Sequence, residues 1–221
     1  MPDSLPPAIV LDLDGTLIDS RDDLAMAVNL TRQEFNLQPL PIAAIVACIG
    51  EGLRNLVVRA IPELPPEQLD QGISRTRFNY SQHLLDKTFL YPTVREALGR
   101  LHQRGCPLAI LTNKPQDFTE AILARLQLDH LFSVVVGGGD PTRPLKPDPA
   151  SVLLILAELK RPSANAWMVG DHFTDLEAGR RAGCKRCFCR YGFGTPNAEG
   201  WDLAVDSLEE FAKEIEMGKH C

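Results

Sequence analysis

Acidic residues stand in pairs where apolar runs of the chain end. Asp12 and Asp14 lie at the end of the first such run, and Asp171 and Asp175 follow a later one. Residues two apart in an extended chain point to the same side, so the first pair should present both carboxylates together. In an open α/β sheet ligands bind outside the carboxyl ends of the strands, where all four carboxylates would meet. Like charges 4 Å apart repel by about 4 kcal/mol at an effective dielectric of 20, so such a cluster must protonate or bind a cation, and its hard oxygen ligands fit Mg²⁺.

A structural role is the alternative for single acids of this kind. One Asp at a strand end could cap a helix, and Asp175 alone could be an acid in the first turn of a helix, where it complements the helix dipole. Two acids at the end of one apolar strand are harder to explain structurally. The pairs therefore favour chemistry over capping.

Residues that can donate hydrogen bonds to an anion stand at two further places where a helix-like stretch begins. Thr112 and Asn113 directly precede a helix-like stretch, and so does Lys146, between prolines that stiffen its loop. A hydroxyl, an amide and free backbone N–H groups at a helix N-terminus form an anion site. A lone lysine is usually a solvated surface charge, but this position favours neutralisation of a phosphate. The four junctions predict acids with a metal on one side and phosphate-binding donors on the other.

The elements that must position these residues alternate along most of the chain. Short Val/Ile/Leu-rich runs are typical of strands buried on both faces of a parallel sheet. Strands are expected at 8–13, 107–111, 132–136 and 166–169, with weaker ones at 185–190 and 203–205. Helices are expected at 94–104, 116–126, 150–159, 175–182 and 208–216, with a capping box at Ser207 and Glu210 and C-terminal caps at Gly105 and Gly183. The alternation predicts an α/β fold with a doubly wound parallel sheet.

One segment departs from this alternation. Between the first strand and residue 107 the chain shows helical periodicity and no convincing strand. Helices are expected at 24–35, 42–48, 53–60, 66–77 and 79–85, and prolines mark the joins. Leu30, Phe35, Leu56 and Leu69 stand at spacings that could form a small separate core. The sequence therefore predicts an α-helical insertion directly after the first strand.

Composition excludes several classes of protein. The 221 residues are 44% hydrophobic, which is enough for a sizeable core and argues against disorder. The net charge of −6 and the absence of a long basic run argue against nucleic-acid binding, and no apolar run is long enough to span a membrane. The N-terminus lacks the pattern of a signal peptide, so a cytoplasmic protein is expected. Cys184, Cys187 and Cys189 have no second pair for a zinc site and are expected to be thiols packed on a strand.

The motifs, taken as an ordered set, resemble those of the haloacid dehalogenase-like (HAD) hydrolase superfamily. They are Asp12-Leu-Asp14-Gly-Thr, Thr112-Asn113, Lys146-Pro and Gly-Asp171-x-x-x-Asp175. The segments DGTLIDS, TNKP and GGGD…KPDP further resemble phosphoglycolate phosphatases and their close relatives, in which a helical cap is inserted after the first motif. The resemblance implies a Rossmann-like core formed by residues 1–16 and 88–221 and an α-helical cap formed by residues 17–87.

The resemblance also implies a mechanism. Asp12 would attack phosphorus and form an aspartyl-phosphate, while Asp14 would protonate the leaving alcohol and then activate water. Mg²⁺ would be held by Asp12, the backbone carbonyl of Asp14 and Asp171, with Asp175 in or near the shell. Thr112, Asn113 and Lys146 would bind and orient the transferring phosphoryl group, so the substrate would be a small phosphomonoester such as phosphoglycolate.

Substrate choice is expected from the inserted helices. The stretch from Ile49 that includes Gly50 resembles the cap substrate loop of the family, and Arg59 is a candidate partner for a substrate carboxylate. Arg59 could equally be a surface residue of an amphipathic helix, and Glu51 would oppose a carboxylate if it pointed inward. His172 is expected to be an exposed loop residue and Trp167 a core residue.

Two other functions remain open at this stage. A phosphomutase acting on a sugar phosphate shares the nucleophile and the cap, and a non-catalytic module that binds a phosphorylated ligand shares the fold. A dehalogenase is disfavoured because Asp14 would have no role, and the binding module is disfavoured because every motif position is intact. The chain is expected to act as a monomer or weak homodimer, with no nucleic-acid or membrane partner.

Overall fold

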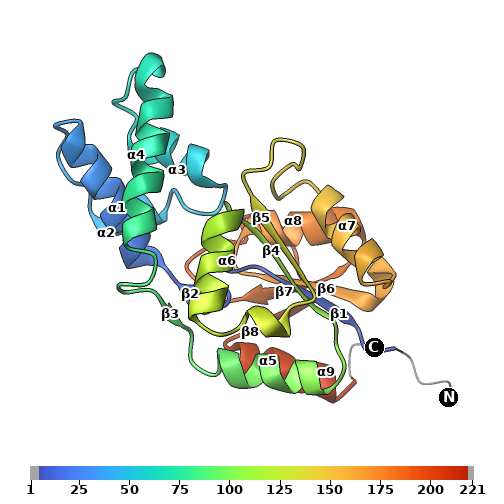
Figure 1. The fold of residues 1–221 in the computed structure, drawn as a ribbon. Helices are drawn as coiled ribbons and strands as arrows, with labels where there is room; N and C mark the ends of the chain where they lie inside the picture. The colour runs from blue at the N-terminus through green and yellow to red at the C-terminus, as the bar shows by residue number, and fades with distance from the viewer. Residues whose placement is uncertain (1–4, 219–221) are drawn as a thin grey trace.

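A six-stranded parallel sheet forms the centre of the molecule (Figure 1). The computed structural model describes residues 5–218, so the ends of the predicted α/β core at 1–4 and 219–221 lie outside the described residues. The strand order is β5-β4-β1-β6-β7-β8. The strands are β1 Ala8–Leu11, β4 Leu108–Pro115, β5 Val134–Gly138, β6 Ala166–Gly170, β7 Lys185–Cys189 and β8 Leu203–Val205. The predicted doubly wound α/β fold is confirmed.

Helices cover both faces of the sheet because its side chains alternate between two apolar clusters. Ile9 and Leu11 of β1 belong to one cluster, whereas Ala8 and Val10 belong to the other. The first face packs against α5 Val94–Gln103, α6 Gln116–Arg125 and α9 Leu208–Glu216, and the second against α7 Ala150–Glu158 and α8 Phe173–Ala182. Trp167 is 1% exposed, as expected of a core residue. Short 3₁₀ turns at Asp129–Leu131 and Ser163–Asn165 precede β5 and β6.

The position of β1 decides where the site forms. The chain passes from β1 outward through β4 to β5 and then returns to place β6 on the other side of β1. β1 therefore lies between β4 and β6, with Val10 opposite both Ala109 and Met168. A reversal of this kind opens a crevice at the carboxyl ends of the adjoining strands. The residues that follow β1, β4 and β6 must meet there.

Helices α1 to α4 lie together to one side of the sheet, at the upper left of Figure 1. They are α1 Arg21–Glu34, α2 Ile42–Val46, α3 Leu53–Ala60 and α4 Leu69–Gln82, with a 3₁₀ turn at Pro66–Gln68 before α4. Two short strands, β2 Ile18–Asp19 and β3 Phe89–Leu90, pair antiparallel where the chain enters and leaves this helical segment. The expectation of no strand here was wrong, because two residues are too few to show a periodicity.

Two further expectations for the helical segment were wrong. The break predicted between 77 and 79 is absent: Asn79 lies inside α4, where its side chain donates to Thr31 Oγ1 at 3.1 Å and to Glu34 Oε1 at 3.0 Å on α1. These bonds satisfy the amide, so it does not compete with the helix backbone. The separate small core is also absent, because Leu56 is buried in the same cluster as Ile9 on the sheet face.

The expected helix ends are largely present. Gly183 at the end of α8 has φ +77° and Gly105 just after α5 has φ +78°, the left-handed backbone that glycine adopts without strain. Ser207 accepts from the backbone N–H of Glu210 at the start of α9. The capping box is incomplete there, because the Glu210 carboxylate accepts from the backbone of Asp206 instead.

Candidate active site

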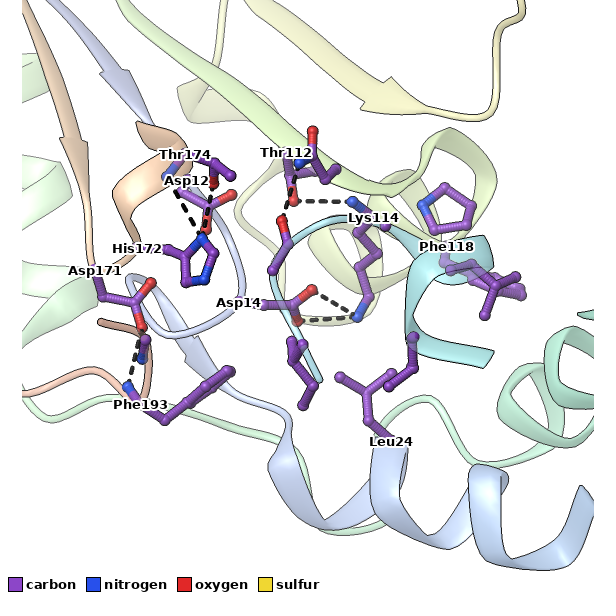
Figure 2. A pocket seen from close by; sticks show the side chains of 18 of the residues that line it. Asp12, Asp14, Leu24, Thr112, Lys114, Phe118, Asp171, His172, Thr174 and Phe193 are labelled. Atoms are coloured by element: carbon purple, nitrogen blue, oxygen red, sulfur yellow. Dashed lines mark hydrogen bonds and ion pairs between the residues drawn. The ribbon is translucent and has the colours of Figure 1, made fainter. Parts of the chain in front are cut away.

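The carboxyl ends of the three central strands bring the motif residues into one pocket (Figure 2). Asp12 follows β1, and its backbone N–H still bonds to Val169 of β6 at 2.9 Å. Thr112 lies in β4, where the pairing with β5 is irregular between Leu111 and Pro115. Asp171 follows β6 directly. All three line the pocket, so residues about 160 positions apart in sequence face one another, as the strand order requires.

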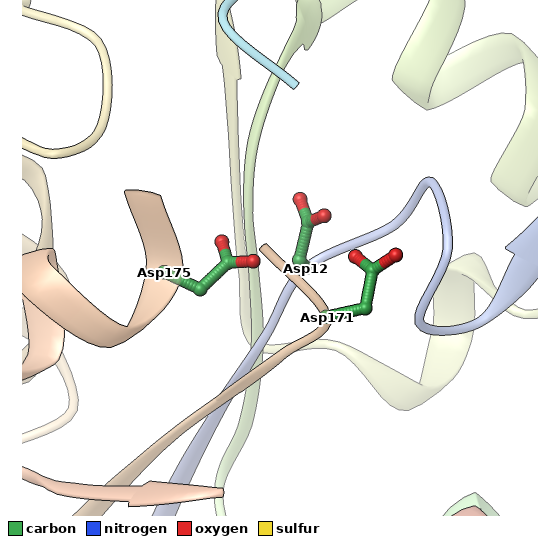
Figure 3. A group of neighbouring side chains, drawn as sticks. All are labelled: Asp12, Asp171 and Asp175. Atoms are coloured by element: carbon green, nitrogen blue, oxygen red, sulfur yellow. The ribbon is translucent and has the colours of Figure 1, made fainter. Parts of the chain in front are cut away.

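Three carboxylates form a buried group at this point (Figure 3). Oxygen atoms of Asp12, Asp171 and Asp175 all lie within 4.8 Å of one another, and the side chains are nearly inaccessible to water. Asp171 Oδ2 accepts backbone N–H groups from Phe193 at 2.9 Å and Gly194 at 2.6 Å. Asp175 is held in the first turn of α8, where it accepts from the backbone of His172 at 3.0 Å.

The local backbone leaves no spare room around Asp171. Gly15 has φ +84°, and a side chain there would overlap the Asp171 carboxylate. A side chain at Gly192 would overlap the same carboxylate from another side. Glycine at these positions lets two loops pack directly onto an acid, which fixes its orientation.

The burial of these acids raises their pKa values. Burial raises the pKa of Asp12 to about 6, against the opposing effect of the nearby Lys146 ammonium. Burial and then the charges of Asp12 and Asp175 raise the pKa of Asp171 well above its usual range, and the two N–H donors only partly offset this. The ionised cluster is therefore costly on its own. Hard, closely spaced oxygens of this kind are the ligands of a divalent cation, so the donor set fits one.

Lys146 supplies a positive charge inside the cluster. Its Nζ donates to Asp12 Oδ1 and to Asp175 Oδ1, each at 2.6 Å, and to the backbone carbonyl of Leu111 at 2.8 Å. Burial alone would lower the pKa of Lys146, but the two carboxylates raise it above its ordinary value. The ammonium therefore stays charged and fixes the Asp12 carboxylate in place.

A second buried lysine, which the sequence analysis did not single out, pairs with Asp14. Lys114 Nζ lies 2.9 and 3.0 Å from the two Asp14 oxygens, and Ser20 Oγ donates to Asp14 Oδ1 at 2.5 Å. Burial tends to lower the pKa of Lys114, but Asp14 and then Tyr80 reverse this and raise it. Lys114 stands two residues after Thr112, so strand alternation alone could have placed it on the side of the pocket. The Asp14 carboxylate faces this lysine and is not part of the three-acid group.

Asn113 makes its hydrogen bonds to backbone groups of two other loops. Its Oδ1 accepts from the N–H of Lys146 at 2.8 Å, and its Nδ2 donates to the carbonyl of Lys146 at 3.0 Å. The same Nδ2 donates to the carbonyl of Gly50 at 2.9 Å. Asn113 therefore ties the loop of Lys146 to the helical segment. Thr112, which is 3% exposed, accepts from the backbone of Lys114 at 3.2 Å and lines the pocket through its hydroxyl-bearing side chain.

The helical segment contributes a mainly apolar wall to the same pocket. Leu24, Leu56 and Tyr80 line it from α1, α3 and α4, and Phe118 lines it from α6. The rings of Tyr80 and Phe118 meet edge to face at 5.3 Å. Gly50 also lines the pocket, packed so closely on His172 that a side chain at Gly50 would come within 2.7 Å of the imidazole.

His172 lies at the pocket, whereas Arg59 lies outside it. His172 lines the pocket and is half-buried, so its prediction as an exposed loop residue was wrong; burial lowers its pKa to about 4. Its ring accepts from Thr174 in the first turn of α8. Arg59 does not line the pocket: it is 44% exposed and forms an ion pair with Glu51 at 2.6 Å. That pair removes the mismatch that an inward Glu51 would create.

None of the cysteines between residues 5 and 218 lines the pocket. Cys184, Cys187 and Cys189 are buried as free thiols at or beside β7, as expected of packing residues. In the described part of the chain the only group of acid, His and Cys side chains close enough to hold a metal is the three-acid group. None of the helices between residues 5 and 218 has the length and apolar character needed to cross a lipid bilayer.

Comparisons with known proteins agree with this arrangement. A profile of haloacid dehalogenase-like hydrolases matches residues 9–189. The chain is 36% identical over 208 residues to a phosphoglycolate phosphatase of Chromobacterium violaceum, covering 92% of this chain and 93% of that protein. It is 38% identical over 221 residues to a phosphoglycolate phosphatase of Aliivibrio fischeri, with 96% and 97% covered. The crystal structure of a predicted phosphoglycolate phosphatase from Haemophilus somnus matches with a TM-score of 0.89 and 29% identity, over 96% of this chain and 98% of that one.

Proposed function

The chain belongs to the haloacid dehalogenase-like hydrolase family and is a phosphoric monoester hydrolase, and we propose that it hydrolyses a small phosphomonoester, phosphoglycolate first, through an aspartyl-phosphate. The observation that carries the proposal is the pairing of each motif acid with its own buried lysine in one pocket. Lys146 holds Asp12, and Lys114 holds Asp14. Asp12 is thereby held as an ionised carboxylate, the form that attacks phosphorus, and Asp14 stands apart from the three-acid group.

The proposed reaction has two steps. In the first, a carboxylate oxygen of Asp12 attacks phosphorus, the bond from phosphorus to the ester oxygen breaks, and Asp14 gives its proton to the leaving alcohol. In the second, Asp14 takes a proton from water, the water oxygen attacks phosphorus, and the bond to Asp12 breaks to release phosphate. Splitting the hydrolysis in this way lets one acid serve twice, first as a donor and then as a base.

We assign the binding of the phosphoryl oxygens to Thr112 and Lys146. The Thr112 hydroxyl can donate into the pocket while it accepts from the Lys114 backbone, and the Lys146 ammonium lies beside the proposed nucleophile. Asn113 would act on the phosphoryl group through Lys146, whose loop it holds. Neutralising charge on the transferring group is a large part of catalysis in phosphoryl transfer.

The cation in this proposal is Mg²⁺, held by the carboxylates of Asp12, Asp171 and Asp175. The side chain of Asp14 faces Lys114, so any part of Asp14 in holding the ion would fall to its backbone carbonyl. When bound, Mg²⁺ supplies positive charge to the transferring phosphoryl oxygens. It would also relieve the repulsion that raises the pKa values of Asp12 and Asp171.

We further propose that residues 17–87 act as a cap over a core formed by 1–16 and 88–221. Support comes from the apolar wall that α1, α3 and α4 add to the pocket and from the Gly50 carbonyl bonded to Asn113. An ion pair between Arg77 on α4 and Asp117 on α6, at 2.5 Å, joins the same two parts. Gly50 would shape the pocket against His172, whereas Arg59 lies outside the pocket and is not needed for it in this arrangement.

A panel of phosphomonoesters assayed with Mg²⁺ tests the proposal. Wild-type protein should release inorganic phosphate and free alcohol in equal amounts, which distinguishes hydrolysis from phosphate transfer within a sugar. Asp12→Asn should abolish turnover while leaving the fold intact, and brief incubation of the wild type with labelled substrate should leave label on Asp12 by peptide mass spectrometry. Retained turnover in Asp12→Asn would refute the nucleophile, and no turnover on any ester would favour a binding module.

A further inference from the structure

Two hydrogen-bond donors of the pocket wall make no contact with the substrate in the mechanism above. Lys114 and Tyr80 lie side by side, with the Lys114 ammonium 4.5 Å from the centre of the Tyr80 ring. We propose that these two side chains bind a carboxylate on the alcohol part of the substrate, next to the carbon that bears the ester oxygen. This rests on the proposed phosphatase function and assigns the two side chains that would distinguish phosphoglycolate from an ester without a carboxylate.

The donors are buried and incompletely used. A lysine ammonium has three N–H groups, and two close contacts of Lys114, at 2.9 and 3.0 Å, go to the two oxygens of Asp14. The Tyr80 side chain is 2% exposed, and no hydrogen bond of ordinary geometry reaches its buried hydroxyl within residues 5–218. A buried hydroxyl without a partner costs free energy, so its presence at the pocket wall calls for an acceptor from a ligand.

The pocket offers a substrate carboxylate no other cation of its own. Arg59 is outside the pocket and paired with Glu51, and Lys146 is already bonded to Asp12, Asp175 and a carbonyl. The His172 ring is already engaged, with Nδ1 3.0 Å from Thr174 Oγ1. Among the described residues that line the pocket, Lys114 is the one permanently charged cation.

Reach also fits a carboxylate close to the ester. One CH₂ group separates the ester oxygen of phosphoglycolate from its carboxyl carbon, so the carboxylate oxygens lie about 3–4 Å from the oxygen that Asp14 protonates. Lys114 Nζ lies 2.9 Å from that same acid. A donor bonded to Asp14 is therefore within reach of a carboxylate carried by the ester. Leu24, Leu56 and Phe118 close the wall beyond and offer no hydrogen bonds to sugar hydroxyls.

The test compares phosphoglycolate with ethyl phosphate, which has a methyl group in place of the carboxylate. The readout is the ratio of the two kcat/KM values, because any general loss of activity cancels in the ratio. Tyr80→Phe should lower the ratio about tenfold, the usual effect of losing one hydrogen bond to a charged group. Lys114→Met should lower it about a hundredfold, since a buried charge pair is lost.

Two matched controls separate this site from general effects. Tyr91 also has a buried hydroxyl without a partner among the described residues, but it does not line the pocket, so Tyr91→Phe should leave the ratio unchanged. Arg59→Ala should also leave it unchanged. Calorimetry of phosphoglycolate binding to Asp12→Asn, with and without Tyr80→Phe, should show binding weakened about tenfold without any turnover.

The outcomes distinguish this proposal from the phosphatase function. Wild-type turnover of ethyl phosphate with no preference for phosphoglycolate overturns the carboxylate site alone. The carboxylate site is also overturned if Tyr80→Phe and Lys114→Met both leave the ratio of the two kcat/KM values within about twofold of wild type. It is overturned as well if Arg59→Ala removes the preference for phosphoglycolate. Failure of the wild type to hydrolyse either ester, or any member of the wider panel, overturns the phosphatase function as well.

Discussion

Replacing Asn113 with alanine should loosen the junction between the lysine loop and the helical segment. Asn113 is 6% exposed, and its amide makes three hydrogen bonds, at 2.8 and 3.0 Å to the backbone of Lys146 and at 2.9 Å to the carbonyl of Gly50. Each is worth about 0.5–1.5 kcal/mol net, and both backbone groups of Lys146 would be left buried without a partner. The free energy of unfolding should therefore fall by about 2–4 kcal/mol.

The same change should slow turnover. Lys146 holds Asp12 through its ammonium, so a backbone shift at Lys146 moves the proposed nucleophile. A displacement of about 1 Å can cost on the order of a hundredfold in rate. We expect kcat for phosphoglycolate to fall by about ten- to a hundredfold, because the phosphoryl group and the carboxylate no longer meet in line.

Urea unfolding followed by circular dichroism measures the first effect, and phosphate release measures the second. The urea midpoint should drop by about 1 M at a typical slope of 2–3 kcal/mol per molar. Asn55→Ala is the matched control, because Asn55 is exposed and donates a single hydrogen bond to a nearby carbonyl at 3.1 Å. An unfolding free energy for Asn113→Ala within about 0.5 kcal/mol of that control would refute the idea that Asn113 holds the two segments together. Unchanged kcat in a destabilised variant would confine Asn113 to folding.

Three other changes follow from the same geometry. Gly15→Ala places a side chain onto the Asp171 carboxylate, from a backbone position at φ +84°. The affinity for Mg²⁺, measured by calorimetry, should therefore fall at least about tenfold, and an affinity equal to that of the wild type would contradict the packing argument. Asp23→Asn should lower the free energy of unfolding, measured with urea, by about 2–3 kcal/mol, because buried Asp23 accepts two backbone N–H groups and a hydroxyl where the chain returns from α4. Asp22→Asn, a change at an exposed residue, should leave the free energy of unfolding unchanged. Mg²⁺ should raise the unfolding temperature less at pH 5 than at pH 7, because Asp12, with a pKa of about 6, must lose its proton to bind the cation. An equal rise at both pH values would count against Asp12 as a ligand.

The sign of the pH effect is opposite without the metal. The folded pKa of Asp12, about 6, is above its unfolded value of about 3.9, so the folded state binds the proton more tightly. The metal-free protein therefore gains stability from this group as pH falls from about 7 to about 4. His172 acts the other way, because its folded pKa of about 4 is below the ordinary value, and its contribution is lost as pH falls from 6.5 towards 4. Comparing samples with and without Mg²⁺ at each pH removes the His172 contribution.

The sheet was predictable because its signal is local. Continuous apolar runs mark β1 and β6, and their ends could be located from the acids that follow them. The sequence gives no direct signal for the strand order. The rule that sites form at the carboxyl ends of strands in an open α/β sheet is nevertheless enough to bring Asp12 and Asp171 together. The two-residue strands β2 and β3 were not predictable, since two residues cover a single period of a strand and cannot show an alternation.

The lysine pairs show why the rest of the site could not be read from the sequence. Lys146 was flagged by its place between prolines, but its two carboxylate partners come from distant loops. Lys114 stands two residues after Thr112, so strand alternation places it on the side of Thr112, but nothing local predicts that it is buried. Its burial depends on Tyr80 of α4, a contact between segments 34 positions apart. Tyr80 in turn lies just after the helix break that the sequence wrongly predicted.

The contact between Lys114 and Tyr80 couples the helical segment to Asp14, the proposed proton donor. Lys114 holds Asp14 from one side and lies over the Tyr80 ring on the other, and Tyr80 packs on Phe118. If α4 moved away from α6, Lys114 would lose the ring and become exposed to water, which weakens its hold on Asp14 because ion pairs are worth little when solvated. Asp14, the proposed proton donor, therefore has its buried partner only when the helices are docked. In the two proposals taken together, substrate selection and proton transfer share Lys114, so a change at this lysine should affect both.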